Sequence, residues 1–324
     1  MVSRIVISLR WFSPACLLLI FYPRMALNFV IISSDAYHIS PSQKNSPPLY
    51  NMVDKASIIV ADKIAAAKMN NATIPILYES ERILIIQKPP GIPHHTSTKK
   101  NSTTLGIIHR IREQQKRRLW GVHRLDQVTS GILVLAKDSD MASQLTRLFA
   151  QHNITKYYVG ISQKPPKKKK QGWVVGGMQK GRNKSWLLTR GEPKNMARTR
   201  FFTTRMSHNL SLAHVTCILF RPYTGKTHQL RVAAKAMGIP LWGDPIYSDG
   251  TLDKNCRTHL HACGIQIPAL EDQANITLWN PPTFLDVDNL ALSKAIGKLM
   301  RKHASVEMIQ AIEYARDDAQ KEIL

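Results

Sequence analysis

Residues 132–136 form an unbroken apolar run, Ile-Leu-Val-Leu-Ala, directly after Gly131. Because no polar residue alternates with the apolar ones, the run predicts a strand with both faces buried inside a sheet. Asp138 or Ser139 can cap a helix that begins immediately afterwards. The apolar residues of that helix would recur at 141, 142, 145, 148 and 149, which is the spacing of one buried helical face.

The rest of the folded region contains more strand signals than helix signals. Further strands are predicted at 74–79, 83–87, 156–162, 198–204 and 210–220. Further helices are predicted at 103–116, beginning after Ser102 or Thr103, at 227–237, ended by Gly238, and as one long amphipathic extension over 288–324. Strands and helices do not alternate strictly, so the pattern favours an α+β fold over a doubly wound sheet.

The N-terminal 34 residues contain three arginines, no acidic residue and an apolar run at 11–22. Twelve residues are too short to span a bilayer. The pattern is typical of a targeting peptide, either secretory or organellar, although Met25 or Met52 could also be the true start. Residues 35–73 are polar and rich in turn-forming residues, which predicts a linker. The chain has four cysteines and no CxxC pair, so a disulfide framework is not expected and a reducing compartment is favoured. The cysteines are Cys16, Cys217, Cys256 and Cys263.

The charge of the chain is concentrated in one region. Of a formal net charge of +23, residues 151–235 supply +17, from 18 Lys and Arg against the single acid Glu192. A basic block beside apolar strands indicates a polyanionic partner, and nucleic acid fits best. A solvated face and a composition bias for organellar import are the alternatives.

Residues 120–131 form a polar loop between a basic helix and the buried strand. Loops held by a rigid scaffold commonly carry catalytic groups. On this pattern alone Asp126 is either a catalytic carboxylate or the partner of Arg124 in a local salt bridge.

Several motifs occur in one order along the chain. They are Lys88-Pro-Pro-Gly91 after an apolar run, His123-Arg-Leu-Asp126-x-x-Thr-Ser-Gly131, Lys156-Tyr-Tyr158, Tyr223-Thr-Gly-Lys-Thr-His-Gln-Leu-Arg231, Gly243-Asp-Pro245 and Leu260-His-Ala262. Together they resemble the signature motifs of the RluA-type RNA pseudouridine synthases over residues 74–285. Lys226 stands where the family usually has arginine and Ala234 where a histidine is common, which leaves the substrate in question rather than the chemistry.

This resemblance implies a catalytic domain with a mixed, largely antiparallel sheet flanked by helices. It implies an isomerase that converts uridine to pseudouridine in tRNA or rRNA without cofactor or metal. By resemblance, Asp126 is the catalytic aspartate, acting as nucleophile or as electrostatic partner of the ribosyl centre. Arg231 would pair with it through its planar fork. Tyr158 would stack on the target base or accept a ribose proton.

Arg124 would occupy the place that a flipped nucleotide leaves in the RNA, with a phosphate contact as the alternative. The further RNA-binding candidates are His123, Lys156, Lys226, His228, Lys167, Lys168, Lys169 and Lys170. The lysine run could instead bind an anionic membrane. The chain could also be a non-catalytic RNA-binding protein that keeps the fold.

Two weaker motifs do not change this interpretation. Cys256, His259, His261 and Cys263 offer zinc ligands, but no second ligand pair has the usual spacing, so no metal site is predicted. Gly176-Gly177-x3-Gly181 lacks the lysine of a phosphate-binding loop. We expect a monomer without stable membrane association. We expect it in the mitochondrion or plastid if 1–34 is a targeting peptide, and otherwise in the cytoplasm or nucleus.

Overall fold

The computed structural model describes residues 73–99, 102–165, 168–190, 195–206, 215–248, 257–270, 273–282, 284 and 289–321. Its helices are α2 (Ile107–Gln115), α3 (Ser139–Ala150), α4 (Gln229–Ala236), α5 (Asn289–His303) and α6 (Val306–Lys321). Its strands are β1 (Ile76–Glu79), β2 (Ile83–Lys88), β3 (Ser97–Lys99), β4 (Ser102–Thr104), β5 (Trp120–Gly121), β6 (Ser130–Ala136), β7 (Thr155–Ser162), β8 (Gln171–Lys180), β9 (Trp186–Thr189), β10 (Met196–Met206), β11 (Val215–Pro222), β12 (Leu260–Ile267) and β13 (Ile276–Trp279).

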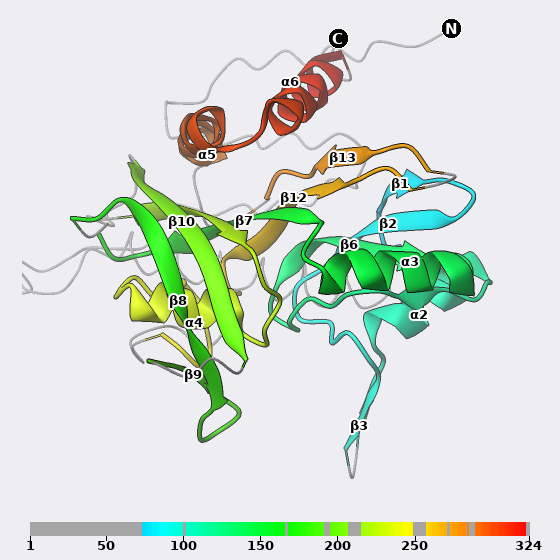
Figure 1. Ribbon diagram of the computed structural model, residues 1–324, viewed down its shortest axis with the longest axis horizontal. Coiled ribbons are helices and arrows are strands. Elements are labelled where there is room, and N and C mark those ends of the chain that lie inside the picture. The colour runs from blue at the N-terminus through cyan, green and yellow to red at the C-terminus, as the bar shows by residue number, and fades with distance from the viewer. Residues whose placement is uncertain are drawn as a thin grey trace, which may run out of the picture. The chain divides into compact units, whose positions relative to one another are not determined.

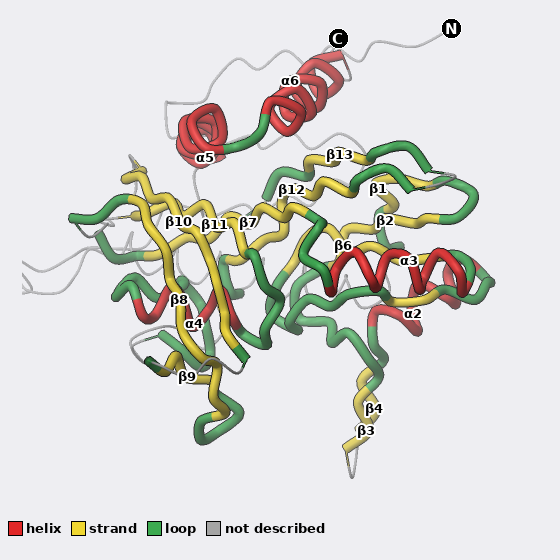
Figure 2. The backbone as a smooth tube through the Cα atoms, viewed as in Figure 1, coloured by secondary structure: helices red, strands yellow, loops and turns green. Residues whose placement is uncertain are grey.

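One large sheet carries the described part of the chain, and a small β3–β4 hairpin stands apart from it (Figures 1 and 2). The strand order is β1-β2-β6-β12-β7-β11-β10-β8-β9, with β13 beside β12 and β5 beside β6. Among the pairings in this sheet, β6 with β12 is parallel and the others are antiparallel. The α+β class and the mixed, largely antiparallel sheet are therefore confirmed.

Strand β6 lies between two helices, one on each face of the sheet. Its odd-numbered residues Leu133 and Leu135 share a cluster with the isoleucines of α2. Its even-numbered residues share a second cluster with Met141 and Leu145 of α3. All seven residues of β6 are buried, as the unbroken apolar run predicts. The Asp138 carboxylate accepts a hydrogen bond from the Met141 N–H at 2.8 Å, so the predicted cap of α3 is confirmed too.

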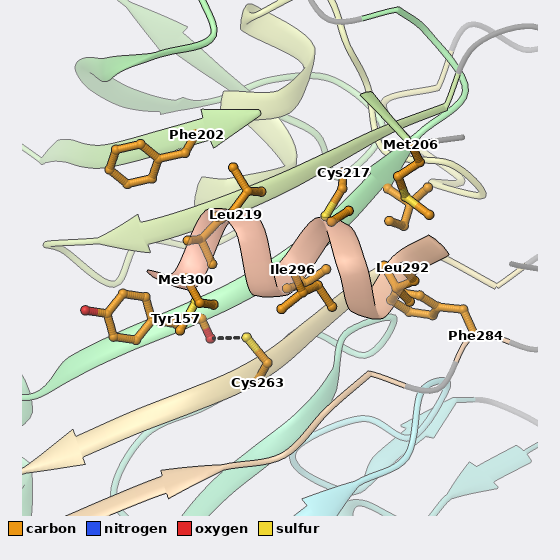
Figure 3. Close-up of a cluster of buried hydrophobic side chains, with 14 of the residues drawn as sticks. Tyr157, Phe202, Met206, Cys217, Leu219, Cys263, Phe284, Leu292, Ile296 and Met300 are labelled. Atoms are coloured by element: carbon orange, nitrogen blue, oxygen red, sulfur yellow. Dashed lines mark hydrogen bonds between the residues drawn. The ribbon is translucent and has the colours of Figure 1, made fainter. Parts of the chain in front are cut away.

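The other half of the sheet is also covered on both faces. Helix α4 packs Leu230 and Ala234 against Phe220 and its neighbours. Helix α5 lies across the opposite face, where Ile296 and Met300 meet the side chains of β7, β10, β11 and β12 (Figure 3). The C-terminal residues are therefore part of the main core instead of a detached extension.

Two predicted helices differ from those observed. The helix expected from Ser102 or Thr103 begins at Ile107, because Ser102–Thr104 pairs with Ser97–Lys99 as a hairpin. The single helix expected over 288–324 is two helices, α5 and α6, separated at residues 304–305, where Ser305 Oγ accepts from the Met308 N–H at 3.3 Å.

The targeting-peptide prediction for 1–34 and nearly all of the linker prediction for 35–73 lie outside the described residues. The domain limits stay predictions. Among the described residues, no helix has both the length and the apolar character needed to cross a membrane.

Candidate active site

A cavity of about 540 Å³ opens where four segments of the chain meet. They are the loop between β5 and β6, the end of α3, strand β7, and the turn from β11 into α4. Eight side chains predicted from the sequence line it: His123, Arg124, Asp126, Lys156, Tyr158, Lys226, His228 and Arg231. The fold therefore brings the motifs that contain Asp126, Tyr158 and Arg231 to one cavity.

A buried lysine, Lys88, holds the loop that carries Asp126. Lys88 is completely buried, and its ammonium donates to the carbonyl oxygens of Pro89, Gln127 and Thr129 at 2.9, 3.2 and 2.8 Å. Burial lowers the pKa of Lys88 to about 7. A turn closes the loop, with the Thr129 N–H donating to the Asp126 carbonyl at 3.1 Å. These bonds hold the loop backbone from Asp126 to Thr129.

The end of the loop is joined to β12 by a close backbone approach. Gly131 has a φ of 110°, and a Cβ there would lie 2.2 Å from the Ala262 carbonyl oxygen, so glycine is required. Next to it, Ser130 Oγ lies 2.9 Å from His261 Nδ1. The other ring nitrogen of His261 lies 2.9 Å from Asn280 Oδ1. The motif glycine and the motif histidine therefore set the position of the loop.

Arg231 forms the predicted ion pair with Asp126 but gives its bidentate fork to another carboxylate. Its Nε and Nη2 donate to both carboxylate oxygens of Asp244 at 2.7 and 2.8 Å, whereas its Nη1 lies 3.7 Å from Asp126 Oδ2. The prediction of a bidentate pair with Asp126 is wrong. Asp244 is fully buried and also accepts from the N–H groups of Ile246 and Tyr247, so it is fixed in place to take the fork. One edge of the guanidinium is left facing Asp126.

The two adjacent tyrosines of β7 point to opposite faces of the sheet. Tyr157 is completely buried in the cluster beneath α5 (Figure 3). Tyr158 is half-buried and lines the cavity. Burial raises the pKa of Tyr158, so its phenol stays protonated and uncharged. One tyrosine of the pair therefore belongs to the core and the other to the cavity.

His123 and Lys156 form the inner wall of the cavity near Phe149. The imidazole of His123 stacks on Phe149 with centroids 4.3 Å apart, and its Nε2 accepts from the Val134 N–H at 2.9 Å. Burial lowers the pKa of His123 to about 3 and also lowers the pKa of Lys156. The His123 ring is therefore neutral and bonded to the backbone, which gives it a role in holding the loop that precedes Asp126.

His228 lines the cavity and is connected through Tyr247 to strand β9. It has a φ of 56° at the start of α4, and its Nδ1 lies 2.8 Å from the Tyr247 hydroxyl. That hydroxyl also accepts from the Trp186 N–H of β9 at 2.7 Å, and the Tyr247 ring centroid lies 5.1 Å from the Arg231 guanidinium. Burial lowers the pKa of His228. Tyr247 therefore supports both His228 and Arg231.

The lysine run lies away from the cavity. Lys168, Lys169 and Lys170 are exposed just before β8 and do not line it, and Lys167 lies outside the described residues. The segment 164–205, which contains the lysine run and lies within the basic block 151–235, contributes β8, β9 and most of β10 to the main sheet. Arg124 is exposed at the rim of the cavity, and Lys226 is partly exposed there.

Three residues of the site were not predicted as such: Lys88, Asp244 and Tyr247. Lys88 and Asp244 belong to motifs recognised in the sequence, so the motifs could have indicated that both residues belong to the site. Their burial and their partners come only from the fold. Tyr247 carried no signal beyond its place two residues after the Gly-Asp-Pro motif.

The zinc ligands considered from the sequence are engaged otherwise. Both ring nitrogens of His261 have partners, and the Cys263 thiol donates to the Tyr157 carbonyl at 3.4 Å. Within the described ranges, no three His, Cys, Asp or Glu side chains are grouped as a metal ligand set. Cys256 lies outside those ranges.

Comparison with known proteins relates the chain to one enzyme family. A family model described as RNA pseudouridylate synthase matches residues 82–236. An uncharacterized RNA pseudouridine synthase of Haemophilus influenzae is 36% identical over 228 residues, which cover 68% of this chain and 97% of that protein. Ribosomal large subunit pseudouridine synthase D of Nitrosomonas europaea is 31% identical over 247 residues, covering 72% and 67% of the two chains.

Solved structures give the same fold. Human RNA pseudouridylate synthase domain containing 1 superposes with a TM-score of 0.55 at 22% identity, covering 66% of this chain and 85% of that one. Human RNA pseudouridylate synthase domain containing 4 gives a TM-score of 0.50 at 24% identity, covering 71% and 94%.

Proposed function

Because the chain belongs to the RluA-type RNA pseudouridine synthases, a family of isomerases acting on RNA, we propose that it isomerises uridine in tRNA or rRNA with Asp126 as its catalytic aspartate. One observation carries this proposal. The Asp126 carboxylate lines the cavity with 17% of its side chain exposed, 3.7 Å from Arg231, and receives no hydrogen bond from the described residues. Its oxygens are therefore available to a substrate.

The reaction is an isomerisation, so no atom is gained or lost overall. The bond from ribose C1′ to uracil N1 breaks, the base turns, a bond forms from C1′ to C5, and the C5 proton leaves while N1 gains one. Positive charge develops on the ribosyl centre as the first bond breaks. A fixed carboxylate stabilises that charge, either electrostatically or by adding to C1′. Arg231 keeps a positive charge 3.7 Å from the Asp126 carboxylate.

Tyr158 and Arg124 have distinct places around the flipped nucleotide. The half-buried ring of Tyr158 offers an apolar face inside the cavity, and its raised pKa favours stacking on the base over acceptance of a proton. Arg124 is exposed at the rim, where it can fill the gap in the RNA or contact a phosphate.

The test of this function is the pair Asp126→Asn and Asp126→Ala, compared with Asp140→Asn. Asp140 is an aspartate on α3 whose side chain is 67% exposed and pairs with Arg82. Unmodified tRNA and rRNA would be incubated with each protein, and pseudouridine would be located by chemical mapping. We expect both Asp126 variants to lose turnover yet keep RNA binding, while Asp140→Asn turns over normally. Turnover by either Asp126 variant would contradict the role given to Asp126.

The alternative is a non-catalytic basic RNA-binding protein with the same fold. The filled positions at Asp126, Tyr158 and Arg231 favour the enzyme, because each lines the cavity. Wild-type protein that binds RNA but forms no pseudouridine would favour the alternative. We also propose that the enzyme acts as a monomer, in an organelle if residues 1–34 are a targeting peptide and otherwise in the cytoplasm or nucleus. Mapping of organellar and cytosolic tRNA and rRNA after its deletion would test the location and name the target.

A further inference from the structure

Away from the cavity, arginine and aromatic side chains gather on one face of β8, β10 and β11. The group comprises Trp173, Arg198, Arg200, Arg221 and Tyr223, and is called the arginine–aromatic platform below. The register places Trp173 opposite Arg200, and Arg200 opposite Arg221. Since side chains alternate along a strand, these residues all project from the face opposite α4.

The members of the platform stack on one another. The Arg198 guanidinium lies 4.4 Å from the Trp173 ring centroid and 5.6 Å from that of Tyr223. The two rings are 4.9 Å apart at an interplanar angle of 49°. Arg200 lies 5.5 Å from Trp173, and Arg221 lies 5.1 Å from Tyr223. Cation–π contacts of this kind fix the guanidinium planes without neutralising their charge.

Helix α5 covers the neighbouring part of the same face and stops at the platform. Its last residue, His303, stacks on Phe202 with centroids 3.7 Å apart, and Phe202 lies at the end of the cluster in Figure 3. Beyond it, Trp173 remains 37% exposed and Val175 remains 49% exposed. The edge of β8 beside them lacks a partner strand among the described residues, because β9 pairs only with Gly177–Lys180. Large apolar side chains are thus open to solvent between arginines.

The charge around the platform suits a nucleic acid. In residues 151–235 the single acid is Glu192 against 18 basic residues. A hollow of about 360 Å³ meets the platform only at Trp173 and otherwise lies on the α4 face of the sheet, where it is lined by apolar side chains such as Phe201, Met237 and Ile239 and by Lys169. A ligand that is anionic and has flat apolar faces matches both features, and single-stranded RNA has this chemistry.

The platform is linked directly to the wall of the cavity. Tyr223 precedes Thr224, whose hydroxyl accepts from the Arg198 N–H at 2.9 Å and which also lines the cavity. The Tyr223 N–H in turn donates to the Arg198 carbonyl at 2.9 Å. The platform lies on the face opposite α4, whereas Tyr158 of the cavity lies on the α4 face, so a chain of RNA with one nucleotide in the cavity reaches the platform by passing around the end of β11 at residues 223–224.

Resting on the proposed function, we propose that the platform binds a single-stranded stretch of the RNA substrate next to the target nucleotide. Trp173 stacks on an unpaired base, while Arg198 and Arg200 contact the backbone. The platform then contributes to affinity and to the choice of RNA, whereas the cavity performs the reaction.

The test measures binding of a short oligouridylate and turnover on unmodified tRNA and rRNA separately. Loss of one stacked base by Trp173→Ala should weaken oligouridylate binding about 5- to 150-fold, and Trp173→Phe should restore most of it. Arg198→Gln should lower the slope of log affinity against log salt by about 0.7 for one lost single-strand phosphate contact. The controls are Ile76→Ala, an exposed apolar residue on the opposite edge strand β1, and Lys294→Gln, an exposed cation on α5.

Binding should also quench the fluorescence of wild-type protein more than that of Trp173→Phe. Weaker binding by Trp173→Ala with unchanged turnover at saturating RNA would support the platform. Affinity equal to that of the controls would overturn it and leave the enzyme assignment intact. If wild-type protein formed no pseudouridine, the enzyme proposal would fail, while the oligouridylate measurements would still decide whether the platform binds RNA.

Discussion

Replacing Asp244 by asparagine removes a negative charge from a carboxylate that is fully buried against Arg231. The variant would leave the guanidinium, itself 3% exposed, without its bidentate partner. Breaking a buried, hydrogen-bonded ion pair from one side typically costs 3–5 kcal/mol. An asparagine NH₂ would also face donors, since both oxygens of Asp244 accept hydrogen bonds.

Asp126→Asn is the matched comparison because it removes the other carboxylate near the same guanidinium. The 3.7 Å separation is too long for a hydrogen bond, so we expect a loss of at most about 1 kcal/mol. In thermal melts followed by circular dichroism, Asp244→Asn should lower the Tm by about 6–20 °C and Asp126→Asn by no more than about 4 °C. Asp126→Asn should nevertheless be the variant that abolishes the reaction outright.

The sequence-based interpretation predicts the opposite order of stability, since it gives the fork of Arg231 to Asp126. Double-mutant cycles with Arg231→Met would report the two coupling energies directly. A melt in which Asp126→Asn is as damaging as Asp244→Asn would refute the arrangement derived from the structure.

Two further substitutions test how the loop of Asp126 is held. Burial lowers the pKa of Lys88 from 10.5 to about 7, so between these pH values the unfolded chain binds more protons than the folded one, and the free energy of unfolding should rise with pH. In urea titrations, the free energy of unfolding of wild type should rise by a few kcal/mol relative to that of Lys88→Met over this range. A difference between the two proteins that stays constant with pH would contradict the prediction. Gly131→Ala should prevent stable folding, because the new Cβ would lie 2.2 Å from the Ala262 carbonyl oxygen at a φ of 110°. The control Gly225→Ala should melt like wild type, because a Cβ at that position has nothing within 4 Å. Equal melting temperatures of the two variants would rule out the close approach at Gly131.

The sequence predicted elements well where the deciding interactions are local. The cap of α3 lies three residues from the group it bonds, and the burial of β6 follows from its own unbroken apolar run. The start of α2 was wrong because its first residues are taken by a pairing with Ser97–Lys99 that helical spacing does not reveal. The place of α5 in the core depends on contacts with strands far earlier in the chain.

The site shows the same limit at the level of single residues. Motifs predicted which side chains would line the cavity, because residue types and spacing carry that information. Whether the fork of Arg231 meets Asp126 or Asp244 depends on where two turns lie in space, and spacing along α4 is compatible with both. Likewise a lysine before two prolines predicts a turn, but its complete burial follows from the loop packed over it.

Strand β12 has a consequence for how the enzyme is made. It is the second-to-last strand in sequence, yet it lies between β6 and β7 and contacts both. Until residues 260–267 are synthesised, the strand after Asp126 and the strand of Tyr158 have no common neighbour to align them. Contacts this distant in sequence slow folding and leave sheet edges exposed meanwhile. Synthesis of Asp126 and Tyr158 therefore long precedes assembly of the candidate site, which waits until β12 has been made.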